Sequence, residues 1–118
     1  MPDAVDPSVL DTLTARLGDR GPAFRTSLVQ TWRDETSRRL ADLDTAATSG
    51  DAAGVARVAH TLKSSSSALG AQPLSALCEE IEVALRTGST RDLAADADAL
   101  RAAVQAADEG FRRHWPVS

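Results

Sequence analysis

The fold of this chain is decided by residues 52–70, which read AAGVARVAHTLKSSSSALG. At 100° per residue this stretch separates into an apolar face and a polar face, which is the pattern of an amphipathic helix. Gly70 follows the last apolar residue and is a typical helix terminator. We therefore predict a helix over about residues 52–69 with one buried face. That face is expected to comprise Val55, Val58, Ala59, Leu62, Ser66 and Leu69.

The opposite face of this helix carries one of the two histidines of the chain. Arg57, His60, Lys63, Ser64 and Ser67 share it. His60 and Leu62 are about 160° apart around the helix axis, so His60 points away from the core if Leu62 is buried. This disfavours a core histidine, whereas an ordinary surface histidine without a task remains an alternative.

The neighbours of His60 suit the transfer of a charged group. A neutral imidazole is a nucleophile near neutral pH. Lys63, the one lysine of the chain, follows one helical turn later, where its ammonium group can offset the negative charge of a phosphoryl group. Ser64 and Ser67 are small and leave His60 accessible to a partner. An exposed histidine, a nearby cation and small neighbours are what a protein-to-protein phosphoryl carrier needs.

The remainder of the chain is also predicted to be helical. Only 3% of the residues are aromatic, and runs of β-branched residues are absent, which disfavours strands. Glycine and proline divide the chain into a short helix over about residues 7–17, a long helix over about 22–48, a fourth helix over 73–88 and a fifth that Ser89 or Thr90 caps. The buried stripe of the long helix is expected to contain Phe24, Leu28, Trp32, Thr36, Leu40, Leu43 and Ala47.

This pattern predicts an all-α fold. Four long amphipathic helices with short connections favour an antiparallel up-down four-helix bundle, and the additional short N-terminal helix is expected to cover one end of it. A length of 118 residues fits one domain, so we expect a single helical domain over residues 1–118, with structure over about 7–115.

Composition and charge exclude several classes of function. The net charge of −4 does not attract nucleic acid or an anionic membrane. No apolar run has the length of a membrane span, and the N-terminus lacks the pattern of a signal peptide. The single cysteine, Cys78, has no partner for an internal disulfide. We expect a cytoplasmic protein with no nucleic-acid or membrane partner.

Residues 59–71, AHTLKSSSSALGA, closely resemble the phosphorylation-site helix of histidine phosphotransfer (HPt) domains. That helix reads roughly A-H-x-L-K-G-S/A-S-x-x-L/I-G-A in the family. Leu74, Leu77, Cys78 and Glu82 match the next helix of the family, which often reads L-x-x-L-C-x-x-L/I-E. The motif covers about two dozen residues, and the helical pattern extends through most of the chain.

The resemblance implies a function in a two-component phosphorelay. His60 would be the phosphoacceptor through Nε2, and Lys63 would stabilise the transferred phosphoryl group. Receiver domains of response regulators or a hybrid histidine kinase would be the partners, and Arg57, Thr61, Ser64 and Ser67 would contact them. The chain would be a monomeric phosphocarrier without autonomous catalysis, cofactor or metal site of its own, because the receiver domain supplies Mg²⁺.

The chain departs from the family pattern at Ser64, where most members have glycine. Serine is the smallest polar replacement, so we expect the approach to His60 to stay open. Two alternatives remain. An HPt-like module could bind a receiver or kinase without carrying phosphate. The dimerisation helices of a histidine kinase fit less well, because that family usually has an acidic residue and a proline at the positions of Thr61 and Ser65.

Other polar residues are assigned structural roles. His114 lies at a predicted helix end, where a cation interacts favourably with the helix dipole. Cys78 falls on an apolar stripe and is expected in the core. Asp96 and Asp98 face different directions on a helix and make a poor catalytic pair. The serines at 64–67 are interpreted as packing space.

Overall fold

The computed structural model describes residues 3–116, and all regular structure within them is helical. This confirms the predicted all-α class. A 3₁₀ turn, Gly18–Arg20, connects the first two helices. The α-helices are α1 (Pro7–Ala15), α2 (Gly21–Thr48), α3 (Ala52–Ala68), α4 (Gln72–Arg86) and α5 (Leu93–His114). None of the helices in the described range is long and apolar enough to cross a membrane.

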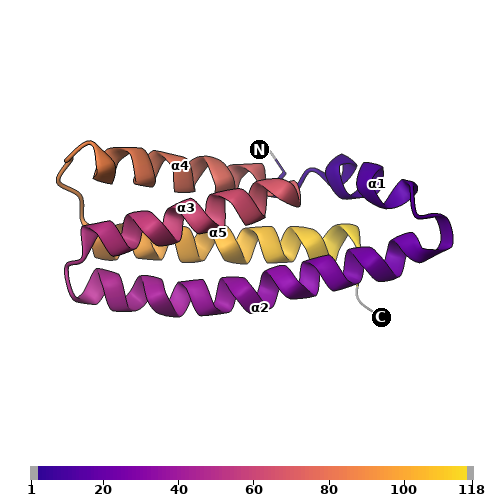
Figure 1. Cartoon of the computed structure of the whole chain (residues 1–118), viewed down its shortest axis with the longest axis horizontal. Coiled ribbons are helices and arrows are strands. Elements are labelled where there is room, and N and C mark those ends of the chain that lie inside the picture. Colours follow the sequence, from indigo (N-terminus) through magenta and orange to yellow (C-terminus); the bar gives the residue numbers. More distant parts are fainter. Residues whose placement is uncertain (1–2, 117–118) are drawn as a thin grey trace.

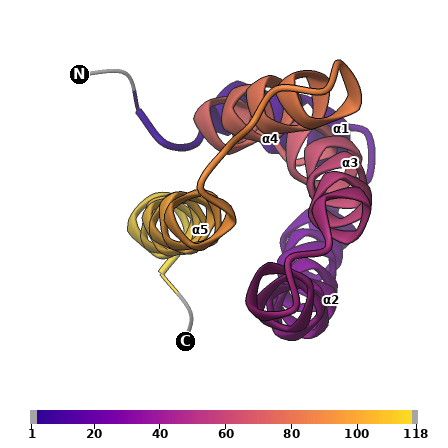
Figure 2. The same ribbon diagram turned by 90° about the vertical axis from the view of Figure 1, so that its left-hand side faces the viewer.

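The four long helices lie side by side along the long axis of an elongated molecule of 48 × 23 × 22 Å (Figure 1). Consecutive helices of this set run in alternating directions. Viewed from the end, α3 lies between α2 and α4, and α5 lies across from α3 (Figure 2). The short helix α1 lies at one end, beside the first turns of α2. The face of α3 that points away from the other long helices is therefore exposed to solvent.

The ends of α3 are fixed by local hydrogen bonds. The Asp51 side chain accepts a hydrogen bond from the Gly54 backbone N–H at 2.9 Å, as an N-cap residue does. At the other end, Gly70 has a φ of +89°, which ends the helix. The Asp6 backbone N–H donates to the Gly70 carbonyl at 2.9 Å, and this contact fixes the segment before α1 to the connection between α3 and α4.

The cap predicted for α5 was wrong. Asp92, not Ser89 or Thr90, accepts the hydrogen bond from the first turn, through the Ala95 N–H at 3.1 Å. The physical reason is the length of the connection. Gly88 ends α4 with a φ of +84°, and the chain needs the following residues to cross to the start of α5. Sequence spacing placed the cap too early.

The core contains the predicted apolar face of α3, together with buried residues of α4 and α5. Every residue of the predicted apolar face of α3 is buried, with Leu62 at 1% exposure. Trp32 packs edge-to-face against Phe111, with ring centroids 5.0 Å apart. Its indole N–H donates to the Ser66 hydroxyl at 3.2 Å, so a polar residue on the apolar face has a partner inside the core. This hydrogen bond links α2 to the helix that carries His60.

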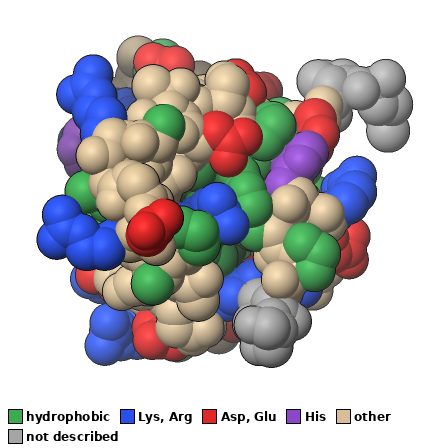
Figure 3. All heavy atoms as spheres, turned by 90° about the vertical axis from the view of Figure 1, so that its right-hand side faces the viewer, with side chains coloured by type: hydrophobic (Ala, Val, Ile, Leu, Met, Phe, Trp, Pro, Cys, Tyr) green, Lys and Arg blue, Asp and Glu red, His purple; other side chains and the backbone are tan. Residues whose placement is uncertain are grey.

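One predicted core residue of α2 lies at the surface. Phe24 is 41% exposed, whereas Val29 and Ala46 are buried on the same helix. The reason is that α2 is longer than its neighbours, and its first turns extend beyond α3 and α5 (Figure 1). There Phe24 lies beside α1 and the 3₁₀ turn, next to Leu13, Leu17 and Arg20. At this end of the molecule, hydrophobic side chains reach the surface among basic ones (Figure 3).

Candidate functional site

His60 projects from the open face of α3. Its side chain is 59% exposed, whereas Ala59 and Leu62 on the opposite face are 0% and 1% exposed. The helical period therefore separates the imidazole from the core, as the sequence predicted. The exposure of the side chain excludes the interpretation of His60 as a core histidine.

The imidazole of His60 is held by a buried carboxylate from the next helix. Nδ1 of His60 lies 2.8 Å from Oε2 of Glu82 in α4, and the Glu82 side chain is only 8% exposed. A carboxylate accepts hydrogen bonds, so Nδ1 of a neutral His60 carries the proton. Nε2 then keeps its lone pair, on the side of the ring away from Glu82. The contact fixes both the tautomer and the orientation of the ring.

Glu82 binds two further cations. Its Oε1 accepts a hydrogen bond from Lys63 Nζ at 2.8 Å, and its Oε2 accepts one from Arg86 Nε at 3.0 Å. The Lys63 hydrogen bond, followed by those from His60 and Arg86, outweighs burial and lowers the pKa of Glu82 to about 2. The same hydrogen bond raises the pKa of Lys63. Both groups are therefore charged at neutral pH, and Lys63 stands beside His60.

Arg57 and Thr61 extend this surface toward α2. Both are exposed, and the Arg57 side chain is 69% accessible. The Arg57 guanidinium lies 3.8 Å from the Asp51 carboxylate, and the Thr61 hydroxyl donates to the Arg57 carbonyl at 3.1 Å. These two residues lie within about one helical turn of His60, on the exposed surface of α3.

Ser64 and Ser67 continue the surface toward the C-terminal end of α3. Ser64 is exposed. Ser67 is half-buried, and its hydroxyl donates to the Gln72 side chain at 3.5 Å at the start of α4. Neither carries a bulky group near the imidazole. The structure thus brings His60, Lys63 and Ser64 together and places Ser67 one turn farther along.

Glu82 and Arg86 were not predicted as members of the site. Glu82 was matched to a family position but received no function. A signal was present, because Glu82 lies one helical turn after the buried Cys78 and directly after the buried Ile81. A carboxylate at the edge of an apolar stripe needs a cationic partner. One sequence does not say which cation of another helix supplies it.

The other polar candidates have structural partners. His114 Nε2 donates to the Asp3 carboxylate at 3.0 Å. Burial raises the pKa of the Cys78 thiol to about 12, so it is no nucleophile at neutral pH. Ser66, in the serine run, lies wholly in the core.

Asp96 and Asp98 of α5 do not form a catalytic pair. Asp96 is buried and accepts two hydrogen bonds from Arg91, both at 2.9 Å, whereas Asp98 is exposed. Across residues 3–116, no three histidine, cysteine, aspartate or glutamate side chains are grouped so as to hold a metal ion. The exposed imidazole of His60 and its hydrogen-bonded neighbours Glu82 and Lys63 form the candidate site.

The network around Glu82 predicts a pH-dependent stability. We expect Glu82→Gln to lower the free energy of unfolding at pH 7 by about 1–2 kcal/mol, because the amide loses the charge that binds the surrounding cations. The folded pKa of Glu82, about 2, lies below the ordinary value of 4.5. Its stabilising effect is therefore complete above about pH 4.5 and is lost as the pH falls toward 2.

Urea denaturation of both proteins between pH 2 and 7 measures this difference. The two stability curves should converge at low pH. A difference that stays constant across the range would show that the charge of Glu82 contributes nothing.

Comparison with known proteins identifies the family of this chain. The family model of the Hpt domain matches residues 27–110. The crystal structure of histidine-containing phosphotransfer protein B (HptB) from Pseudomonas aeruginosa PAO1 is similar, with a TM-score of 0.80 and 26% sequence identity, over 97% of this chain and 96% of that chain. No curated protein matches the sequence. This chain belongs to the Hpt domain family, whose members transfer phosphoryl groups through a histidine in phosphorelays.

Proposed function

We propose that this protein is the histidine phosphotransfer component of a two-component phosphorelay, with His60 as its phosphoacceptor. His60 would accept a phosphoryl group from an aspartate of one receiver domain and pass it to another. The observation that carries this proposal is the hydrogen bond between His60 Nδ1 and the buried Glu82, at 2.8 Å, which leaves Nε2 as the nucleophilic atom on an exposed ring.

This geometry supports the following transfer reaction. The Nε2 lone pair attacks the phosphorus atom of the receiver's aspartyl phosphate. An N–P bond forms as the bond from phosphorus to the carboxylate oxygen breaks, and the aspartate leaves as a carboxylate. The phosphorylated imidazole keeps the proton on Nδ1, and Glu82 stabilises the resulting positive charge on the ring. The exchange of the P–O bond for the N–P bond is reversible. The same arrangement therefore supports phosphoryl transfer from His60 back to a receiver aspartate.

Lys63 supplies positive charge near the transferred group. Its ammonium nitrogen, Nζ, lies 2.8 Å from Oε1 of Glu82, and the Lys63 side chain is 28% exposed. From there it lies within one turn of His60 and can offset charge on the phosphoryl oxygens. Its bond to Glu82 keeps the flexible side chain in place before a partner binds.

The division of labour follows that of the family. We infer a phosphocarrier without autonomous catalysis, in which the receiver domain supplies Mg²⁺ and the acidic pocket, and this chain needs no cofactor. Arg57, Thr61, Ser64 and Ser67 would form the partner-binding surface around His60. A cytoplasmic location stays a prediction.

We also infer a single monomeric domain. In it, α2 to α5 form an antiparallel up-down four-helix bundle and α1 is an addition at one end. The alternation of the helices and the single cluster of buried apolar residues support this arrangement. Gel filtration tests the monomer, because a kinase dimerisation domain would elute as a dimer.

Phosphate transfer from a labelled receiver domain tests the function. Receiver domains carrying ³²P on their aspartate would be mixed with this protein. The proposal predicts label on this chain that is acid-labile and alkali-stable, as expected for a phosphohistidine. Measurable binding to receivers without label would instead favour the interaction module. If none of several receivers labels this protein or binds it, the proposed function is refuted.

Substitution of the lysine tests its role. We expect Lys63→Ala to slow the transfer to His60 roughly tenfold or more without abolishing it, because the nucleophile remains but nearby positive charge is lost. Rapid quench of the labelled transfer measures this rate. Lys63→Arg keeps the charge and should recover part of the rate. An unchanged rate in Lys63→Ala would remove this residue from the mechanism.

A further inference from the structure

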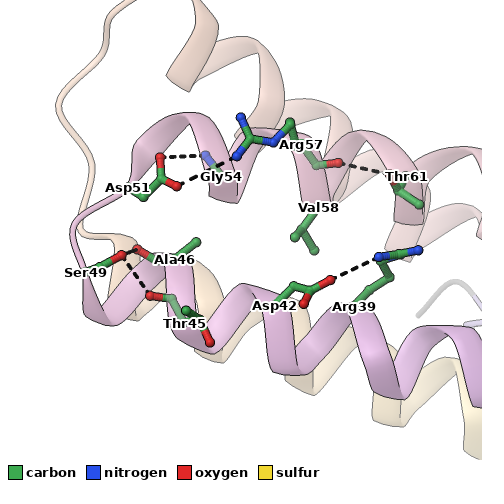
Figure 4. Close-up of a pocket in the computed structure, with 10 residues that line it drawn as sticks. All are labelled: Arg39, Asp42, Thr45, Ala46, Ser49, Asp51, Gly54, Arg57, Val58 and Thr61. Carbon is green, nitrogen blue, oxygen red and sulfur yellow. Dashed lines mark hydrogen bonds and ion pairs between the residues drawn. The ribbon is translucent and has the colours of Figure 1, made fainter.

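A groove lies beside the candidate site, between the C-terminal half of α2 and the N-terminal half of α3 (Figure 4). Its volume is about 470 Å³. We call it the α2–α3 groove. The side chains that matter here are Arg39 and Asp42 from α2 and Asp51, Arg57, Val58 and Thr61 from α3 and its cap.

The α2–α3 groove is continuous with the surface around His60. On a helix, Arg57 lies about 60° and Thr61 about 100° to one side of His60, whereas Lys63 lies about 60° to the other side, toward Glu82. Arg57 and Thr61 also line the groove. A partner that covers His60 therefore meets the groove within one helical turn.

Two arginines face this groove from its opposite walls (Figure 4). Arg39 Nη1 donates to Asp42 at 3.0 Å, with side chains 43% and 59% exposed. Arg57 lies 3.8 Å from Asp51, with side chains 69% and 47% exposed. Ion pairs at such exposure contribute little to stability. Both guanidinium groups can thus exchange their intramolecular partner for one on another protein.

The remaining cations near His60 are not available in this way. Lys63 and Arg86 bind the same carboxylate, Glu82, which is 8% exposed and would lose two of its three partners without them. Arg39 and Arg57 are therefore the cations suited to intermolecular contacts. Below them, Val58 is 6% exposed and supplies an apolar floor.

We propose that the α2–α3 groove is a docking site for an acidic segment of the partner receiver domain, whose carboxylates bind Arg57 and Arg39. This inference rests on the proposed phosphotransfer function and names the contact that helps select the partner. The chain carries a net charge of −4, and the groove itself is charge-balanced, because Asp42 and Asp51 pair with its two arginines. An acidic segment would bind by replacing these two carboxylates with its own. Guanidinium groups match carboxylates in geometry as well as in charge.

The test is the double substitution Arg39→Ala/Arg57→Ala in the transfer assay, with the receiver domain that labels the wild-type protein. We expect the half-saturating receiver concentration to rise about tenfold at low ionic strength, with a much smaller change in maximal rate. Added salt should weaken the wild type more than the variant, because the variant has lost the screened contacts.

The matched control is Arg38→Ala/Arg113→Ala. Both of these arginines are exposed and lie outside the groove, and their loss changes the net charge by the same amount. Circular dichroism shows whether each variant is folded. A groove variant whose half-saturating concentration and salt dependence equal those of the control would overturn the docking site.

The two proposals fail in different ways. If no receiver labels the wild type, the phosphotransfer function itself is refuted. If the wild type is labelled and the groove variant behaves as the control does, the phosphotransfer function stands and only the docking site is wrong.

Discussion

His60→Gln is expected to abolish phosphoryl acceptance, with transfer from a receiver domain reduced to background. Glutamine keeps a polar side chain that can reach Glu82, but its amide nitrogen has no lone pair available for attack on phosphorus. The label that the wild type acquires should therefore be absent. Scintillation counting after gel separation measures it.

The same substitution should leave the fold intact. The His60 side chain is 59% exposed, and substitutions at such positions usually change the free energy of unfolding by about 0.5 kcal/mol or less. His114→Gln is the matched control, because it replaces the other histidine, which lies in α5 and contacts Asp3 rather than Glu82. Label that persists in His60→Gln and disappears in His114→Gln would transfer the function to the other end of the chain.

Leu62→Asp is expected to have the largest effect on stability. Leu62 is 1% exposed and lies on the buried face of α3. Aspartate would leave a cavity and place a charge without a partner in the core, at a cost of about 4 kcal/mol or more. Such a loss is a large part of the stability of an ordinary domain, about 5–15 kcal/mol. Urea denaturation at pH 7 measures the loss.

The control for this substitution is its neighbour. Thr61 is exposed, so Thr61→Asp introduces the same charge one position earlier on the open face. Its free energy of unfolding should stay within about 1 kcal/mol of the wild type. Equal stabilities of Leu62→Asp and Thr61→Asp would contradict the orientation of α3, and with it the exposure of His60.

The orientation of α3 was predictable from the sequence because its apolar residues recur at helical spacing over the whole segment. The same period failed in α2. Phe24 fits the stripe of that helix, yet it is 41% exposed because α2 extends beyond the other helices there. Periodicity gives the face of a helix but not the length over which neighbours cover it. The cap at Asp92 escaped for a related reason, since the path of a connection depends on where both helices end.

The candidate site was predictable only in part. His60 and Lys63 lie on one helix, so their proximity follows from spacing alone. The partner of both, Glu82, belongs to α4 and lies 22 positions after His60. That contact depends on the register of two packed helices, which no local pattern encodes. Its consequence is chemical, because Glu82 decides which nitrogen of His60 is free.

The central claim is that Nε2 of His60 accepts the phosphoryl group while Glu82 holds Nδ1. The most direct measurement is nuclear magnetic resonance of the phosphorylated protein, with ³¹P and ¹⁵N-labelled histidine, which identifies the phosphorylated atom. The structure predicts one phosphohistidine, at His60, with phosphorus on Nε2. Phosphorus on Nδ1 of His60, or on His114, would contradict it.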